Sequence, residues 1–269
     1  MVNRVTGFIL MMAALYLGHG LIAVSMALVC GELAGLSAVW YLTRQFVVPL
    51  PIVHVAMWRH ILILAAPLAA GNLLIALVNR LDTMMLEAMT GLVQVGTYGA
   101  AYRITSMLEK LPLLVMATLY PLMSRFAASD PAHLKRFYHR SLRNMALIAA
   151  VMVVSLSVLA PVINRTLTPD FPAAVILLRV LALSTACMYV AVVGGNLLIV
   201  LGRQSAGLWA WILAGPVNVV LNLILIPRYG ALGAALATLA SFLIVLVVVL
   251  VLAERCLRRA TEGARGVTA

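Results

Sequence analysis

The sequence predicts an all-α protein, a polytopic membrane helical bundle with about eight transmembrane helices. Of the 269 residues, 64% are hydrophobic and only 10% are charged, and the mean hydropathy is +1.10. Soluble domains are about 45–50% apolar and about 25% charged. The apolar residues also form long runs instead of covering one face of each element, so a soluble fold could not bury them. The lipid bilayer is therefore the expected surrounding of this chain.

Eight apolar segments meet or approach the length that crosses a membrane, which is roughly 20 residues for a helix. Pro49 and Pro51 interrupt any helix between the second and third segments, because proline lacks the backbone N–H and clashes with the preceding turn. The connecting segments are too short for a further domain. The predicted spans are residues 5–16, 21–41, 60–81, 95–123, 142–163, 172–201, 206–226 and 232–252.

The charge pattern predicts the orientation of these spans. The net charge is +11, but the basic residues gather at the ends of the apolar runs, as in proteins that are oriented by basic cytoplasmic loops. With the N-terminus inside, most of the 19 lysines and arginines fall on the cytoplasmic side, and only Arg80, Arg165 and Arg228 fall on the outer side. The pattern predicts both termini in the cytoplasm and argues against nucleic acid as a partner.

No motif in the sequence indicates a metal site, a cofactor or a catalytic centre. Cys30, Cys187 and Cys256 are widely spaced, and none forms a CxxC pair. The five histidines lack ligand spacing, and the sequence has no HExxH motif and no glycine-rich phosphate loop. We therefore expect no metal, no cofactor and no enzymatic activity.

Ionisable groups inside the spans are functional candidates, because inserting a charge into a bilayer costs about 3 kcal/mol. The fourth predicted span holds most of them: Arg103, Ser106 and Lys110 share one helix face, and Glu109 lies one position off it. Two cations that face a cavity would suit a pyrophosphate group, since guanidinium pairs with phosphate oxygens. The structural alternative is that Glu109 pairs with a cation and holds neighbouring helices in register.

Three further groups of polar residues are candidates for a substrate pathway. Arg80 and Asp82 end the third predicted span and point to different faces; alternatively, both extend to the outer headgroups. Arg179 either faces a cavity or pairs with a carboxylate such as Glu109. The last pair, Asn218 and Asn222, shares a helix face just after Pro216, where interhelical hydrogen bonding is the alternative role.

Several sequence strings together resemble a known family. The most specific one is an asparagine-containing helix that closes on Ile-Pro-Arg-Tyr-Gly and reopens on a helix of small residues. The strings are Asn79-Arg80-Leu81-Asp82 with Met84-Met85-Leu86, Val95-Gly96-Thr97-Tyr98 with Ala100-Ala101-Tyr102-Arg103-Ile104, Leu119-Tyr120-Pro121-Leu122-Met123-Ser124, Asn218 to Asn222, and Leu225-Ile226-Pro227-Arg228-Tyr229-Gly230-Ala231-Leu232-Gly233-Ala234-Ala235. From about residue 60 onward the chain resembles the second half of Wzx-like polysaccharide flippases. These belong to the multidrug/oligosaccharidyl-lipid/polysaccharide exporter superfamily.

The resemblance implies a MATE-like fold in which two six-helix lobes enclose a central cavity. Residues 60–258 would form the six-helix C-terminal lobe, and residues 1–43 would be the last two helices of an incomplete N-terminal lobe. Residues 44–59 would be a cytoplasmic linker between the lobes, and residues 259–269 a basic cytoplasmic tail. About four helices of the first lobe have no counterpart, so we expect either a part of a longer protein or a truncated product.

The function that the resemblance implies is the flipping of lipid-linked oligosaccharide or polysaccharide precursors across a bacterial inner membrane by alternating access. If this transport is coupled to protons, Glu32 in the second span is a candidate proton site. The alternatives are a truncated inactive remnant, a multidrug antiporter of the same superfamily, and a membrane enzyme of glycan assembly. The expected partners are the lipid-linked glycan and the bilayer. Further candidate partners are other membrane proteins of glycan assembly and a second copy of the chain.

Overall fold

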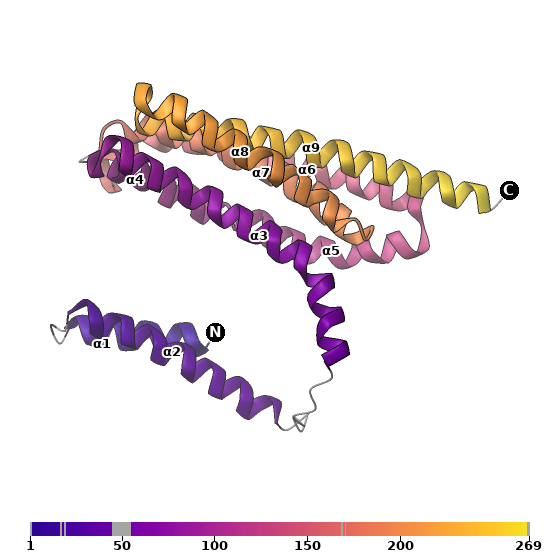
Figure 1. Cartoon of the computed structure of the whole chain (residues 1–269), viewed down its shortest axis with the longest axis horizontal. Coiled ribbons are helices and arrows are strands. Elements are labelled where there is room, and N and C mark those ends of the chain that lie inside the picture. Colours follow the sequence, from indigo (N-terminus) through magenta and orange to yellow (C-terminus); the bar gives the residue numbers. More distant parts are fainter. Residues whose placement is uncertain are drawn as a thin grey trace. The chain divides into compact units, whose positions relative to one another are not determined.

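The computed structural model shows an all-α chain (Figure 1). It describes residues 2–16, 18, 20–44, 55–167, 169 and 171–267. Within these ranges, the side chains of Val2 and Leu21, some side chains of α3 and those after residue 261 lie outside the description. The described helices are α1 (Val2–Tyr16), α2 (Leu21–Thr43), α3 (Val55–Thr90), α4 (Leu92–Leu108), α5 (Leu111–Ser129), α6 (Pro131–Leu167), α7 (Ala174–Val200), α8 (Gln204–Tyr229) and α9 (Ala231–Val267).

The chain divides into two compact units, Met1–Arg59 and His60–Ala269. In the first unit, α1 packs along α2. The two helices approach closely at Gly7 and Gly31, where a Cβ on Gly31 would lie 2.8 Å from the backbone nitrogen of Gly7. Asn3 on α1 donates a hydrogen bond of 3.0 Å from Nδ2 to Oε2 of Glu32 on α2. Glu32, which the sequence suggested as a proton site, thus accepts a hydrogen bond between the two helices.

The predicted linker, residues 44–59, lies mostly outside the described residues. Its last part is already helical, because α3 begins at Val55. The predicted tail, residues 259–269, begins inside a helix, because α9 continues to Val267. The predicted domain boundaries at residues 43, 59 and 258 stay predictions.

Six segments of the described residues are long and apolar enough to cross a membrane, which is fewer than the eight that the sequence predicted. The first predicted span is too short, because α1 has only 15 residues. The third predicted span lies in α3, where many side chains are outside the description. The six segments are Ile22–Thr43, Leu92–Ser129, Pro131–Thr166, Ala174–Val200, Gln204–Tyr229 and Ala231–Thr261.

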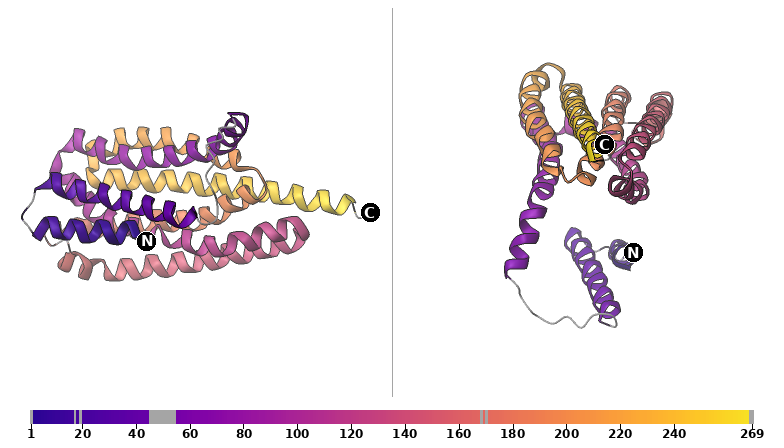
Figure 2. Two further views of the ribbon diagram at one scale, coloured as in Figure 1. Left: turned by 90° about the horizontal axis from the view of Figure 1, so that it is seen from below. Right: turned by 90° about the vertical axis from the view of Figure 1, so that its right-hand side faces the viewer.

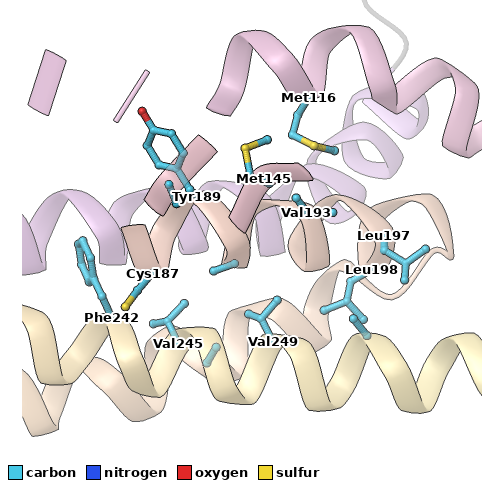
Figure 3. Close-up of a cluster of buried hydrophobic side chains, with 14 of the residues drawn as sticks. Met116, Met145, Cys187, Tyr189, Val193, Leu197, Leu198, Phe242, Val245 and Val249 are labelled. Atoms are coloured by element: carbon cyan, nitrogen blue, oxygen red, sulfur yellow. The ribbon is translucent and has the colours of Figure 1, made fainter. Parts of the chain in front are cut away.

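Helix α7 is the centre of the second unit, where the helices run side by side as a bundle (Figure 2). It contacts α4, α5, α6, α8 and α9. Its sequence is apolar on all sides, which is typical of a helix enclosed by others. Figure 3 shows its side chains Cys187, Val193 and Leu197 within the main hydrophobic cluster, between α9 and the helices α5 and α6.

The fourth predicted span, residues 95–123, is divided into two helices, α4 and α5, that meet at Glu109 and Lys110. The reason is Pro112, which has no N–H to donate to the carbonyl four residues earlier, that of Leu108. The hydroxyl of Tyr189 on α7 donates a hydrogen bond of 2.8 Å to this carbonyl. The break is therefore stabilised from the central helix.

Candidate functional site

A buried carboxylate, that of Asp82 near the C-terminal end of α3, is the centre of the most connected polar cluster among the described residues. Only 1% of this residue is exposed. Its Oδ1 accepts a hydrogen bond of 2.6 Å from Nδ2 of Asn222 on α8, and its Oδ2 accepts one of 2.7 Å from the hydroxyl of Thr238 on α9. The carboxylate thus joins α3 to two consecutive helices, α8 and α9, that lie far from it in the sequence.

Two further side chains complete this cluster, which we call the Asp82 cluster: Asp82, Tyr98, Asn218, Asn222 and Thr238. The hydroxyl of Tyr98 on α4 lies 3.5 Å from Oδ2 of Asp82 and 3.4 Å from the hydroxyl of Thr238, at the long limit for hydrogen bonds. Asn222 also donates from Nδ2 to Oδ1 of Asn218, over 3.0 Å. All five residues are at most 2% exposed.

The α8–α9 hairpin positions Asn222 opposite Thr238. The two residues are equally far along the chain from Gly230, which ends α8 with a φ of 57°, a backbone conformation that favours glycine. Gly233 then lies against α8: a Cβ there would meet the backbone of Leu225 and of Ile226. Glycine at these positions allows the close helix contact that places both side chains beside Asp82.

No cation balances Asp82 within the described part of the chain, where the two ion pairs are His139–Glu254 and Arg258–Glu254. A buried charge without a counter-charge is costly, so the cluster favours binding of one positive charge. Carboxylate, amide and hydroxyl oxygens are ligands that hard cations prefer. Among the described residues, two buried atoms, Nδ2 of Asn218 and Oδ1 of Asn222, have no hydrogen-bond partner, so the cluster also has spare polar atoms.

The orientation of the Asn222 amide fits this interpretation. In an asparagine side chain, the positions of the amide oxygen and nitrogen are assigned from their hydrogen bonds. A rotation of the amide group by half a turn exchanges the two atoms. With Nδ2 toward Asp82, the amide satisfies the carboxylate. After a half-turn, Oδ1 would face Asp82 and could act as a ligand of a cation bound there. One residue can therefore serve both the cation-free and the cation-bound site.

The candidate residues around the α4–α5 break are more exposed than the Asp82 cluster. The side chains of Arg103 and Lys110 are exposed, while Ser106 and Glu109 are half-buried. Ser106 donates to the carbonyl of Arg103 over 3.0 Å, within its own helix. Since α4 ends at Leu108, helical spacing no longer places Lys110 on the face of Arg103. The predicted internal pairing of Glu109 with a cation is wrong for the described residues, where Glu109 makes no ion pair.

Arg179 contacts a carbonyl, and it does not pair with Glu109 as the sequence suggested. Its Nε donates over 3.3 Å to the carbonyl of Ser157 on α6. This carbonyl lacks its helical partner because Pro161, four residues later, has no N–H. Arg179 and Tyr189, both on α7, thus satisfy the two carbonyls that Pro161 and Pro112 leave free.

The structure separates Arg80 from Asp82. Arg80 is exposed, which agrees with a side chain that extends to the headgroups, whereas this account is wrong for the buried Asp82. The predicted shared face of Asn218 and Asn222 is confirmed by their hydrogen bond. Sequence reasoning missed Tyr98 and Thr238 as members of the site. A usable signal for Thr238 was its position opposite Asn222 across the turn at Gly230.

The fold and the site together define a class. A multi-pass helical membrane protein that buries an unpaired carboxylate among neutral polar groups has the features of a transporter, since intramembrane carboxylates mark ion pathways. The family model of MatE matches residues 67–224, more than half of the chain, and the model described as "Polysaccharide biosynthesis protein" matches residues 1–127. The chain belongs to the MatE family, within the multidrug/oligosaccharidyl-lipid/polysaccharide exporter superfamily of membrane transporters.

A curated relative is the "Uncharacterized membrane protein MJ1068" of Methanocaldococcus jannaschii. It is 24% identical over 181 residues, which cover 65% of this chain and 34% of the relative. The matched part of this chain thus spans about a third of that protein. No solved structure matches the chain.

Proposed function

We propose that the protein flips a lipid-linked oligosaccharide or polysaccharide precursor across a bacterial inner membrane by alternating access, driven by a monovalent cation that binds at Asp82. The observation that carries the proposal is the buried Asp82 carboxylate, which, among the residues that the structure describes, receives only neutral donors, from α4, α8 and α9. One carboxylate among neutral groups balances one positive charge, which favours Na⁺ or a proton over a divalent ion.

Cation binding at this position would change how four helices pack. The cluster joins α3, α4, α8 and α9 through the side chains of Asp82, Tyr98, Asn222 and Thr238. A ligand shifts a conformational equilibrium only by its different affinity for the two states. Oxygen ligands contributed by separate helices supply such a difference, because any movement of one helix disassembles the site.

The exposed cations of α4 and α5 support the choice of an anionic lipid-linked substrate. Arg103 and Lys110 are exposed on either side of the break, and Arg103 can bind two phosphate oxygens at once. The match to a polysaccharide biosynthesis family over residues 1–127 includes this region. The proposal includes a six-helix MATE-like lobe over residues 60–258 and both termini in the cytoplasm.

The test is flipping of a fluorescent pyrophosphate-linked oligosaccharide lipid in proteoliposomes that hold an imposed Na⁺ or proton gradient. We expect flipping by the wild type to depend on one of the two gradients, and Asp82→Asn to lose this dependence. Glu87→Gln is the matched control, because it removes one exposed carboxylate from the same helix. Gradient-dependent flipping that persists in Asp82→Asn would refute the coupling role, and no flipping of any lipid-linked glycan would refute the substrate.

A multidrug antiporter is a second candidate, because the MatE model matches the larger part of the chain. The same proteoliposomes distinguish a flippase from a multidrug antiporter. Cation-driven movement of an organic cation such as ethidium, without flipping of the glycan lipid, would favour the antiporter. The role of Asp82 as the coupling site would be the same in both cases.

A further inference from the structure

Helices α6 and α9 are longer than a membrane is thick. Each has 37 residues, which corresponds to roughly 55 Å, whereas the hydrocarbon core measures about 30 Å. The uncharged stretches, residues 144–164 of α6 and 231–253 of α9, would fill this core by themselves. The remainder of each helix, roughly 20 Å long, therefore projects beyond the hydrocarbon.

The projecting parts of the two helices lie together at one end of the bundle. Nε2 of His139 on α6 lies 3.4 Å from Oε2 of Glu254 on α9, which makes an ion pair when the imidazole is protonated. Figure 1 shows the C-terminal end of α9 and the turn from α5 to α6 at the same end of the second unit. His139 is four residues from Arg143, where the charged part of α6 ends, and Glu254 is the first charged residue of α9. The ion pair thus aligns the polar boundaries of both helices.

This end of the bundle carries an excess of exposed arginine. The two carboxylates that the structure describes there already have partners: Asp130 accepts the backbone N–H of His133 over 2.9 Å, and Glu254 lies at ion-pair distance from His139 and Arg258. Within the described residues, no carboxylate lies at ion-pair distance from three exposed arginines close to the boundary. These are Arg140, Arg143 and Arg255.

Apolar side chains continue from these arginines along α6. Leu147, one helical turn after Arg143, is 60% exposed, and Val151, one turn further, is 67% exposed. A ligand that fits this face has an anionic head and an apolar tail. A soluble phosphate or an acidic protein would use the arginines but leave the apolar face without a partner.

We propose that Arg140, Arg143 and Arg255 bind the phosphate of an anionic phospholipid such as phosphatidylglycerol, whose acyl chains lie along Leu147 and Val151. The arginines lie within one or two turns of the uncharged stretches, at the level where lipid headgroups are found. Guanidinium groups pair with phosphate oxygens through two hydrogen bonds each. The proposal does not depend on the transport function.

The test measures binding of dioctanoyl phosphatidylglycerol and dioctanoyl phosphatidylcholine to the detergent-purified full chain by native mass spectrometry. We expect the anionic lipid to bind at least about tenfold more tightly, because each basic residue near an anionic lipid contributes about 1 kcal/mol. The double variant Arg143→Gln/Arg255→Gln is expected to lose most of this preference. The conservative double variant Arg143→Lys/Arg255→Lys is expected to retain it.

The matched control is Arg165→Gln/Arg228→Gln, which also removes two exposed arginines, from the far end of α6 and the end of α8. Its lipid preference should equal that of the wild type. Equal binding of the two lipids, or equal losses in the two glutamine variants, would refute the proposal. Displacement of the lipid by equimolar inorganic pyrophosphate would show a site for free phosphate and would refute it as well. If the first double variant does not fold, Arg143→Gln alone should show a smaller loss of roughly threefold to fivefold.

Discussion

Two polar regions of the second unit differ in almost every physical respect. The Asp82 cluster is anionic, at most 2% exposed, and held by side chains from α3, α4, α8 and α9. The region around the α4–α5 break is rich in cations and largely exposed, and the bond that Ser106 makes to the described residues stays within its own helix. Helix packing defines the first region, whereas the local sequence defines the second.

The difference indicates a division of roles. The hydrogen bonds of a group that is enclosed by several helices depend on the relative positions of these helices, because the bonds break when the helices move. An exposed cation can bind an anionic ligand without constraining the fold. Substitutions in the Asp82 cluster should therefore change stability and ion response, and substitutions at the exposed cations should change substrate handling alone.

The largest loss of stability is expected from Asn222→Ala. The variant removes the shortest hydrogen bond to Asp82, of 2.6 Å, and leaves the carboxylate with one close donor. A bond to a charged group that is lost in the interior costs about 2–3 kcal/mol of unfolding free energy. The measurement is SDS-induced unfolding in mixed micelles, compared with wild type.

The matched control for this variant is Asn196→Ala on α7. Within the described part of the chain, Asn196 donates only to the carbonyl of Val192 in its own helix, over 2.8 Å, so its loss should cost less than about 1 kcal/mol. Equal costs in the two variants would mean that the Asp82 cluster contributes no more stability than a local bond.

The second prediction concerns the response to ions. If Na⁺ binds at Asp82, the unfolding free energy of the wild type should rise with NaCl relative to choline chloride. The rise reaches about 2.7 kcal/mol at one hundred times the dissociation constant. Asp82→Asn should abolish it and Glu87→Gln should retain it. If Na⁺ does not change the stability of the wild type, the proton remains the candidate coupling ion. If Asp82→Asn is still stabilised by Na⁺, the ion binds at another site.

A smaller effect is expected from Tyr189→Phe, which removes the donor to the Leu108 carbonyl at the α4–α5 break. The carbonyl would then have neither its helical partner nor a substitute, at a cost of about 1–2 kcal/mol. Tyr138→Phe is the control, because Tyr138 is equally buried and its hydroxyl has no hydrogen bond to the described residues. SDS-induced unfolding in mixed micelles measures the loss of unfolding free energy in both variants. Equal losses would show that the hydrogen bond from α7 does not stabilise the α4–α5 break.

Hydropathy predicted the membrane-embedded helices well where both ends are marked by polar residues or turns. The predicted span 172–201 corresponds to α7 (Ala174–Val200), and 206–226 to α8 (Gln204–Tyr229). The predicted spans 142–163 and 232–252 also lie within candidate membrane segments, but they cover only part of α6 and α9, which continue as helices past their apolar stretches. A rule based on apolar length stops at the first charged residue, whereas backbone hydrogen bonding continues as long as the residues favour helix.

The division between α4 and α5 required tertiary information. Pro112 was visible in the sequence, but a proline inside a span either kinks a helix or ends it. Here the helix is divided, and Tyr189, from a helix far along the chain, supplies a donor to the carbonyl that Pro112 leaves free. Nothing in the local sequence around Pro112 predicts that donor.

The candidate site was predictable only in its most polar members. Asp82, Asn218 and Asn222 stand out because charged and amide side chains are costly in a bilayer. Tyr98 and Thr238 do not stand out, since both are neutral and a threonine hydroxyl can bond within its own helix, as Thr238 can to the carbonyl of Ala234 at 2.9 Å. Their membership follows from helix packing around Asp82.

The smallest effect on stability is expected from Arg103→Ala, and this variant tests the comparison most directly. The side chain of Arg103 is exposed and makes no ion pair with the described residues, so its removal should change the unfolding free energy by less than about 0.5 kcal/mol. If it binds a substrate phosphate, flipping of the glycan lipid should nevertheless fall by roughly tenfold, because a charge-assisted hydrogen bond contributes about 1.5 kcal/mol or more. The flipping rate of Arg103→Lys should lie between those of the wild type and Arg103→Ala, since lysine keeps the charge but cannot bind two phosphate oxygens in one plane. Normal flipping in Arg103→Ala would remove Arg103 from the substrate pathway, and a loss of stability above 1 kcal/mol would assign it a structural role like that of Arg179.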